Sequence, residues 1–209
     1  MSIFHVAIDG PAASGKGTAA AGLSKHLGIP CLDTGAINRG VAVHIRNTPS
    51  ISNMQISVQI VDNITRVTLN GKDITMLLRE NEISQAVSKI ATNPDVRALV
   101  TKISQGIANK QSLIAEGRDI CSVVLPEAKY KFFLTANPKV RAKRRHAELV
   151  AKGKDISFKQ VLKETKERDK RDATKGGLVR TKDAVLIDTT KLTVDQTVER
   201  MLEYILDGN

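Results

Sequence analysis

Aromatic residues are scarce in this sequence. They make up 3% of its 209 residues, and tryptophan is absent. A surface that stacks unpaired nucleic-acid bases in series needs several aromatic side chains, so the composition argues against such a surface. Since 41% of the residues are apolar, the chain can still bury a sizeable core, built mainly from Ile, Leu, Val and Ala.

Cysteines and long apolar runs are also few. The two cysteines, Cys31 and Cys121, form no CxxC pair, which predicts free thiols in a reducing compartment. No window approaches the roughly 18 consecutive apolar residues of a transmembrane helix. The stretch from Met1 to Gly10 does not have the basic region followed by an apolar region that marks a signal peptide. We therefore expect a cytoplasmic protein without a membrane partner.

Positive charge is abundant but unevenly spread. Residues 139–182 hold 16 of the 32 Lys and Arg residues and only 6 of the 22 acidic residues, so this segment alone accounts for the net charge of +10. A local excess of this kind favours an anionic partner, either nucleic acid or a polyphosphate nucleotide. A solvated helix face that only adds solubility would have the same composition.

The apolar pattern predicts an α/β fold. Residues 3–8 form an apolar run that leads into a Gly-rich turn, and a helix is expected over Lys16–Leu27. Four further short strands, separated by helical patterns, are expected at Cys31–Asp33, Leu113–Ala115, Lys131–Leu134 and Ala184–Ile187. Such an order is typical of a five-stranded parallel sheet covered by helices on both faces, which makes three layers.

Local signals mark further elements. An Asn-Pro pair predicts a helix start at Pro94 and at Pro138, and Ser-x-x-Gln and Thr-x-x-Gln predict capping boxes beginning at Ser157 and Thr193. The last helix has one apolar face, which we expect to pack in the core and which comprises Val194, Val198, Met201, Leu202 and Ile205. Residues 65–75, with an Asn-Gly turn between two strand patterns, predict a small β excursion on the rim of the sheet.

The strongest motif is a Gly-rich loop between the first strand and the first helix. It matches G-x-x-x-x-G-K, in the context that this motif requires. Its glycines let backbone N–H groups turn toward phosphate oxygens, and its lysine places a positive charge on the transferred phosphate. The motif predicts an ATP-binding loop formed by Gly10, Pro11, Ala12, Ala13, Ser14, Gly15, Lys16, Gly17 and Thr18.

Arginines follow two of the expected strands. Arg39 comes after the second strand and Arg118 after the third, at the edge where open α/β sheets bind ligands. Guanidinium groups match phosphate oxygens bidentately, so these two side chains can grip one phosphate from two sides. The loop thus predicts a phosphoryl donor, and the arginines predict a phosphorylated acceptor.

The chain resembles the bacterial cytidylate kinase family. The resemblance rests on Ile8–Thr18, Leu32–Arg39, Ala115–Ile120, Lys166–Asp172 and Asp183–Thr190, which occur in the family's order. It implies a P-loop kinase that transfers phosphate from ATP to CMP and dCMP with Mg²⁺. It also implies a single domain, with its core at 1–34, 111–155 and 176–209, an acceptor-binding insertion at about 35–110 and a mobile lid at about 156–175.

The resemblance also implies roles for individual residues. The matching CMP-binding positions are Thr34, Arg39, Ser88, Arg97, Arg118, Asp119, Asp172 and Lys175. Arg97 and Asp119, with Ser88, match the positions that bind the cytosine base. Thr18 would face phosphate and magnesium, and the matching catalytic residues are Lys16, Arg118, Arg168 and Arg171. No histidine is assigned a role, because the acceptor is already an anionic phosphate oxygen.

Four departures from the family's pattern involve five positions. Asn38 stands where Tyr is usual, Cys121 where Gly is usual and Lys175 where a phosphate-binding Arg is usual, while Gly176 and Gly177 replace a segment that usually contains Pro. Lys175 keeps the positive charge but loses the planar guanidinium of arginine, which could weaken phosphate binding. We expect the departures to affect substrate affinity rather than the reaction.

Several alternatives stay open at this point. Another P-loop kinase acting on UMP, AMP or shikimate would keep the loop but not the cytosine-binding pair. A nucleic-acid-binding ATPase would use the basic segment as its footprint, and its binding would weaken steeply with salt. A nucleotide-sensing module would need no arginines at the strand ends. We expect a monomeric kinase that does not bind nucleic acid.

Overall fold

A computed structural model of the chain describes residues 3–48, 50–174 and 178–208. A few side chains within its helices lie outside that description: Asn47, Arg79, Asn81, Ser84, Gln85, Ser88, Lys89 and Thr174. Among the described residues, no helix combines the length and the apolar character that crossing a membrane requires.

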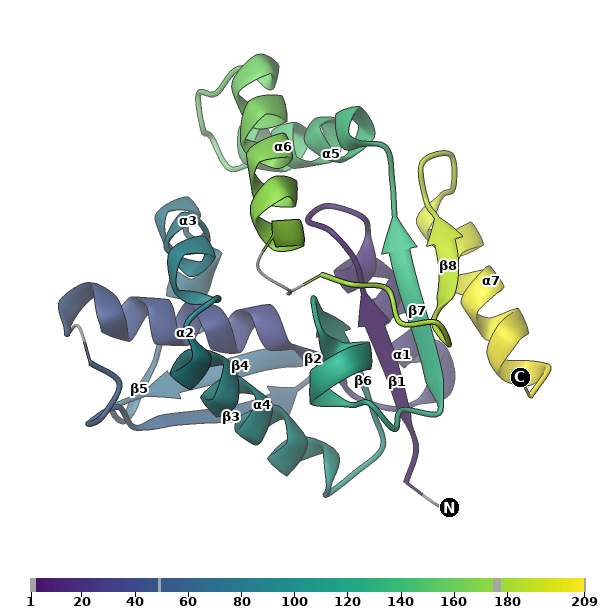
Figure 1. Cartoon of the computed structure of the whole chain (residues 1–209), viewed down its shortest axis with the longest axis horizontal. Coiled ribbons are helices and arrows are strands. Elements are labelled where there is room, and N and C mark those ends of the chain that lie inside the picture. The colour runs from purple at the N-terminus through teal and green to yellow at the C-terminus, as the bar shows by residue number, and fades with distance from the viewer. Residues whose placement is uncertain (1–2, 49, 175–177, 209) are drawn as a thin grey trace.

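The centre of the fold is a parallel sheet of five strands (Figure 1). The strands lie in the order β2-β6-β1-β7-β8, with bounds β1 His5–Asp9, β2 Cys31–Asp33, β6 Leu113–Gly117, β7 Tyr130–Thr135 and β8 Val185–Asp188. This sheet confirms the predicted fold class. Because the strands are parallel, their carboxyl ends meet at one edge, where Asp9 lies beside Gly117 and Asp33 beside Glu116.

Helices cover both faces of the sheet. Helices α1 (Lys16–Leu27) and α7 (Val194–Leu206) cover one face, while α2 (Thr34–Asn47), α4 (Pro94–Ala108) and a π-helical turn, η2 (Ile120–Val124), cover the other. Side chains of β1 alternate between the two. Val6 and Ile8 pack with the α1 and α7 side, whereas Ala7 packs with the α2 and α4 side. Strand β1 is therefore buried on both faces, whereas Leu186 of the edge strand β8 is half-exposed.

A second, smaller sheet lies between β2 and β6 in the sequence. It comprises β3 (Ile56–Val61), β4 (Ile64–Leu69) and β5 (Lys72–Asp73), all antiparallel, and is followed by η1 (Leu77–Arg79) and α3 (Asn81–Ile90). Strands β4 and β5 and their Asn-Gly turn match the predicted excursion. Strand β3 was missed, although its apolar residues alternate with polar ones, as in a half-buried strand.

The basic segment forms two packed helices, α5 (Pro138–Ala151) and α6 (Phe158–Thr174), beyond the carboxyl ends of β1 and β7 (Figure 1). The predicted helix starts are confirmed, since the Asn93 and Asn137 side chains cap α4 and α5. Thr193 and Gln196 form the expected capping box. At Ser157 half of the expected box forms: the Gln160 backbone amide donates to the Ser157 hydroxyl (3.2 Å), whereas the Gln160 side-chain amide donates to Glu164 (3.3 Å).

One expectation about the last helix was wrong. Val194 was predicted to lie in the core, but 46% of its surface is exposed, whereas Val198, Met201 and Ile205 are buried. Val194 is the first residue of α7, directly after the capping threonine, so it lies at the end of the apolar face.

Candidate active site

The Gly-rich loop connects β1 to α1 and turns sharply to do so. Ala13 has a φ of 57° and Gly15 a φ of 94°, both in the left-handed region. Gly10 also has a positive φ, and a Cβ there would lie 2.0 Å from the carbonyl oxygen of Leu134 in β7. A larger residue at position 10 would therefore push the loop away from the sheet.

Lys16 lies at the start of α1 with its amine turned into the loop. Its Nζ donates a hydrogen bond to the Pro11 carbonyl (3.1 Å) and lies 3.9 Å from Oε2 of Glu116 in β6. Burial, assisted by the charge of Arg118, lowers the pKa of Lys16 to about 8. Burial raises the pKa of Glu116, and the neighbouring carboxylate of Asp33 raises it further. Phosphate oxygens beside Lys16 would favour its charged form.

The opposite wall of the loop is held by two residues that were assigned no role from the sequence. The Thr189 hydroxyl, after β8, donates to the Ser14 carbonyl (2.8 Å). Arg144 of α5 in turn donates through Nη2 to the Thr189 carbonyl (2.7 Å). Thr189 lies in a segment that carries the family resemblance, but only the fold brings it to the loop.

A cavity of about 640 Å³ opens beside the loop. It brings together most of the predicted site residues: Ala12, Ala13, Lys16, Thr34, Arg39, Arg97, Arg118, Asp119, Arg168, Arg171 and Asp172. The other loop residues, from Gly10 to Thr18, continue around the same turn. Two predicted residues cannot be placed, because Lys175 and the side chain of Ser88 lie outside the described residues.

Arg97 and Asp119 meet in the wall of the cavity that Lys16 also lines. Arg97 projects from α4, and its Nη2 lies 2.5 Å from Oδ2 of Asp119, which directly precedes η2. Burial raises the pKa of Asp119, while the charge of Arg97 opposes that rise. Val100 and Val124 add apolar lining to the same cavity. The wall thus offers one donor group, one acceptor group and apolar surface.

The start of α2 forms another part of the cavity wall. Asp33 caps this helix by accepting from the Ala36 amide (3.1 Å), and its other oxygen lies 2.5 Å from Nη2 of Arg39. The Thr34 hydroxyl donates to the Glu116 carbonyl (2.9 Å), which ties α2 to β6. Asn38, the first departure from the family's pattern, lines the cavity and donates to the Thr34 carbonyl (3.1 Å).

Arg118 links the phosphate loop to helix α6. It donates a hydrogen bond to the Gly10 carbonyl of the loop, and its Nε lies 3.1 Å from Oδ2 of Asp172 in α6. Arg168, one turn earlier in α6, also lines the cavity. Burial and the nearby charge of Arg118 lower the pKa of Arg168 to about 10. Positive charge from three different segments therefore converges on the loop.

The arrangement rests on a buried carboxylate that was given no role from the sequence. Asp9 at the end of β1 is fully buried and accepts from the amides of Ile120 (2.8 Å) and Cys121 (2.9 Å). Burial raises its pKa, and these two hydrogen bonds oppose the rise. Asp9 thereby fixes η2, and with it Asp119, to the strand that carries the loop. Cys121, the second departure, is buried at this junction.

The oxygen donors near Lys16 suit a magnesium ion that enters with a nucleotide. Magnesium keeps most of its water and needs only one or two protein oxygens besides phosphate. The Glu116 carboxylate is one candidate, since its Oε2 lies 3.9 Å from Nζ of Lys16 and a Cβ on Gly17, next to Thr18, would lie 3.3 Å from its Oε1. Among residues 3–48, 50–174 and 178–208, no group of three or more His, Cys, Asp or Glu side chains could hold a metal by itself.

Solved structures share the fold at low sequence identity. A shikimate kinase from Bacteroides thetaiotaomicron is 11% identical with a TM-score of 0.52, and the match covers 98% of this chain and 99% of that chain. A gluconokinase from Sinorhizobium meliloti is 12% identical with a TM-score of 0.53, covering 99% and 94%. This fold, with a phosphate loop and a cavity beside it, is the P-loop kinase fold.

Sequence comparison resolves the family within that class. The model of the cytidylate kinase family matches residues 6–207. A cytidylate kinase of Thermosipho melanesiensis is 42% identical, covering 96% of each chain, and one of Carboxydothermus hydrogenoformans is 39% identical, covering 97% of each. The chain belongs to the cytidylate kinase family.

Proposed function

We propose that this protein transfers the γ-phosphate of ATP to CMP and dCMP, forming CDP and dCDP. The observation that carries the proposal is the Arg97–Asp119 pair, with 2.5 Å between Nη2 and Oδ2, in the cavity that also contains Lys16. Family membership supports the same reaction. A kinase for another acceptor has no need of this pair.

The pair suits the hydrogen-bonding edge of cytosine. Cytosine presents O2 and N3 as acceptors and its exocyclic amine as a donor. Arg97 has only donors, and an ionised Asp119 has only acceptors, so together they complement that edge. Uracil carries an oxygen in place of the amine, and a carboxylate would repel it. Asp119 therefore selects against UMP in this proposal.

Phosphoryl transfer requires positioning and charge more than covalent chemistry from the protein. The loop amides and Lys16 hold the β- and γ-phosphates of ATP. Arg39 and Arg118 hold the phosphate of the acceptor. Arg168 and Arg171 stabilise the negative charge on the phosphoryl group during its transfer. Asp172 orients Arg118 and contacts the sugar of the acceptor. No general base is needed, since the attacking atom is an anionic phosphate oxygen.

Magnesium, held through Thr18 and the donor phosphates, would neutralise charge that builds up on the β- and γ-oxygens. The lid formed by α6 would exclude water, which otherwise competes as an acceptor. The proposal also includes that the protein acts in the cytoplasm as a monomer and does not bind nucleic acid. Size-exclusion chromatography and a mobility shift with DNA at low salt test the monomer and the absence of nucleic acid.

The first experiment is ADP release measured with ATP and magnesium against CMP, dCMP, UMP, AMP, GMP and dTMP in parallel. Turnover with CMP and dCMP, well above that with the other four, is the expected result. Preferred turnover with AMP or dTMP would keep the kinase but overturn the assignment of Arg97 and Asp119. Turnover with none of the six would overturn the proposed function.

A further inference from the structure

Arg141, in the first turn of α5, is a buried charged residue that the proposed mechanism leaves without a role. Only 3% of its surface is exposed. Its guanidinium makes a bidentate pair with Asp169 of α6, with Nη1–Oδ1 at 2.9 Å and Nη2–Oδ2 at 2.6 Å. This bidentate geometry makes a strong ion pair, because it adds two charge-assisted hydrogen bonds to the attraction.

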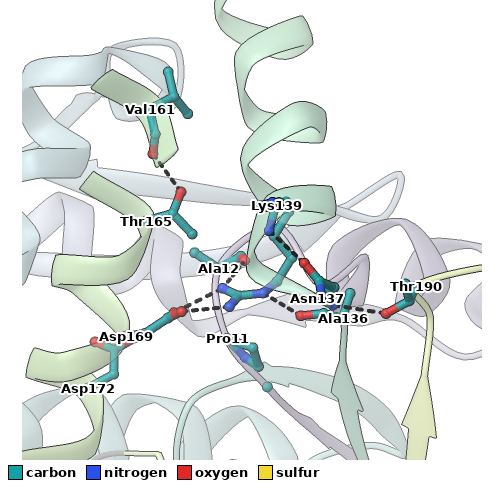
Figure 2. Close-up of polar contacts among 12 residues, drawn as sticks. Pro11, Ala12, Ala136, Asn137, Lys139, Val161, Thr165, Asp169, Asp172 and Thr190 are labelled. Atoms are coloured by element: carbon teal, nitrogen blue, oxygen red, sulfur yellow. Dashed lines mark hydrogen bonds and ion pairs between the residues drawn. The ribbon is translucent and has the colours of Figure 1, made fainter. Parts of the chain in front are cut away.

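The same guanidinium also contacts two backbone carbonyls. Nε donates to Ala136 (2.8 Å), which follows β7, and Nη1 donates to Ala12 (3.3 Å) in the phosphate loop. Figure 2 shows Asp169, Ala12 and Ala136 gathered around one set of guanidinium nitrogens. Arg141 thus joins the loop, the end of the sheet and α6 at a single point.

Asp169 lies between the groups that α6 brings to the cavity. Arg168 precedes it directly in the sequence, and Asp172, one turn later, lies 3.1 Å from Arg118. Helix α6 is therefore held to the core by two carboxylates one turn apart, each on a different arginine. Two such contacts fix the rotation of a helix about its axis as well as its distance from the core, and rotation decides where Arg168 points.

We propose that Arg141 and Asp169 are positioning residues, which set the orientation of α6 so that the Arg168 guanidinium faces the phosphate loop. Neither touches the reacting atoms in this proposal. They act through Arg168. Because Arg141 contacts both Asp169 of α6 and the Ala12 carbonyl, it also fixes the position of α6 relative to the loop. The inference rests on the proposed function, because Arg168 has a catalytic role only if phosphate is transferred.

A purely structural ion pair would also be costly to break, since an unpaired buried charge destabilises a fold. The two roles differ in what a second substitution does. If Asp169 acts through the guanidinium of Arg168, replacing Asp169 has no further effect on kcat once that guanidinium has been removed. If Asp169 only stabilises the fold, its effect on turnover is the same in both backgrounds.

The test is a double-mutant cycle with D169N and R168K. Asparagine keeps the shape but turns one acceptor into a donor that faces Arg141, and lysine at 168 keeps the charge without the planar fork. D169N in the wild-type background should lower kcat by about 10- to 100-fold with little change in KM for ATP or CMP, because misplacing a catalytic group by about 1 Å costs that much. In the R168K background, D169N should change kcat less than about twofold.

The matched control is D183N. Asp183 forms an ion pair with Lys131 at 2.5 Å, near the start of β8 and away from the cavity, and the chemical change is the same. This variant should keep the wild-type kcat. Hydrogen exchange adds a readout that does not depend on activity: amides of α6 should exchange faster in D169N than in D183N.

Equal losses of kcat from D169N in both backgrounds, or an unchanged kcat, would overturn the inference. If D169N does not fold, D169E replaces it in the double-mutant cycle. Glutamate keeps the charge, but its side chain is one methylene longer and would shift α6. R141K should reproduce the kcat loss of D169N. Wild-type enzyme that transfers no phosphate to any of the six acceptors would instead refute the proposed function, and exchange in α6 would still report whether the pair holds the helix.

Discussion

Asp119 lies 2.5 Å from Arg97, although one follows β6 and the other projects from α4. The two groups proposed to bind cytosine are thus each other's partners, and a change in one alters both. D119N should raise KM for CMP by about 10- to 100-fold, since a good bidentate contact is worth about 1–3 kcal/mol of discrimination. KM for ATP should change little.

The same variant should shift acceptor preference. The asparagine amide can donate to the uracil oxygen that a carboxylate repels, so the ratio of kcat/KM for UMP over CMP should rise in D119N. Steady-state assays with both acceptors measure it, with D183N as the control for a change from carboxylate to amide. Equal losses of CMP and ATP affinity would contradict the assignment of Asp119 to the base.

Lys16 should make ATP binding proton-linked. Its lowered pKa of about 8 means that above this pH the amine is largely neutral in the free protein, whereas bound phosphates favour the ammonium form. Binding of ATP above about pH 8 should therefore take up a proton, and binding near pH 6 should not. Calorimetric enthalpies in buffers of different ionisation enthalpy measure the uptake. In K16R, whose guanidinium stays charged, the buffer dependence should vanish.

Removing the Asp9 carboxylate should destabilise the fold. D9A would leave the buried amides of Ile120 and Cys121 without their acceptor, and each unsatisfied group costs about 1–3 kcal/mol. Urea unfolding should show a loss of several kcal/mol in D9A and a smaller loss in D9N, which keeps one oxygen. Equal stabilities of D9A and wild type would contradict the proposed support of η2.

Two glycines in helices should respond in opposite ways to alanine. A Cβ on Gly22 of α1 would lie 2.7 Å from Cγ2 of Val198 in α7, whereas a Cβ on Gly106 of α4 would meet no atom within 4 Å. G22A should destabilise by about 1–3 kcal/mol through overpacking, and V198A should relieve part of that loss. G106A should stabilise by up to about 1 kcal/mol, because alanine favours the helix. Thermal unfolding compares the three variants.

Local and periodic features of the fold were predictable from the sequence. Strand β2 and helix α1 were predicted with the bounds that the structure has, because Gly28 marks the end of the helix and Pro30 directly precedes the strand. The capping residues Asn93, Asn137 and Thr193 were likewise found from spacing alone. The resemblance also assigned roles to residues that line one cavity, among them Arg97 and Asp119, which lie 2.5 Å apart.

Residues whose role depends on partners far along the chain escaped prediction. Asp9 and Arg141 look in the sequence like an ordinary strand end and one charge among many in a basic helix. Asp9 is identified only by amides more than 100 positions away, and Arg141 by the carbonyl of Ala12 and the carboxylate of Asp169. Periodicity records which face of a helix is apolar, but it does not record which distant group lies opposite a buried charge.

Strand β1 is the first part of the sheet to be synthesised, yet both of its neighbours come late in the chain. It pairs with residues 113–117 on one side and 130–133 on the other. The phosphate loop is therefore synthesised well before β6 and β7, the two strands that hold β1 in the sheet. A nascent chain that stops before Tyr130 has the whole loop sequence but only one of the two strands that flank β1, so the candidate site can form only after β7 has been translated.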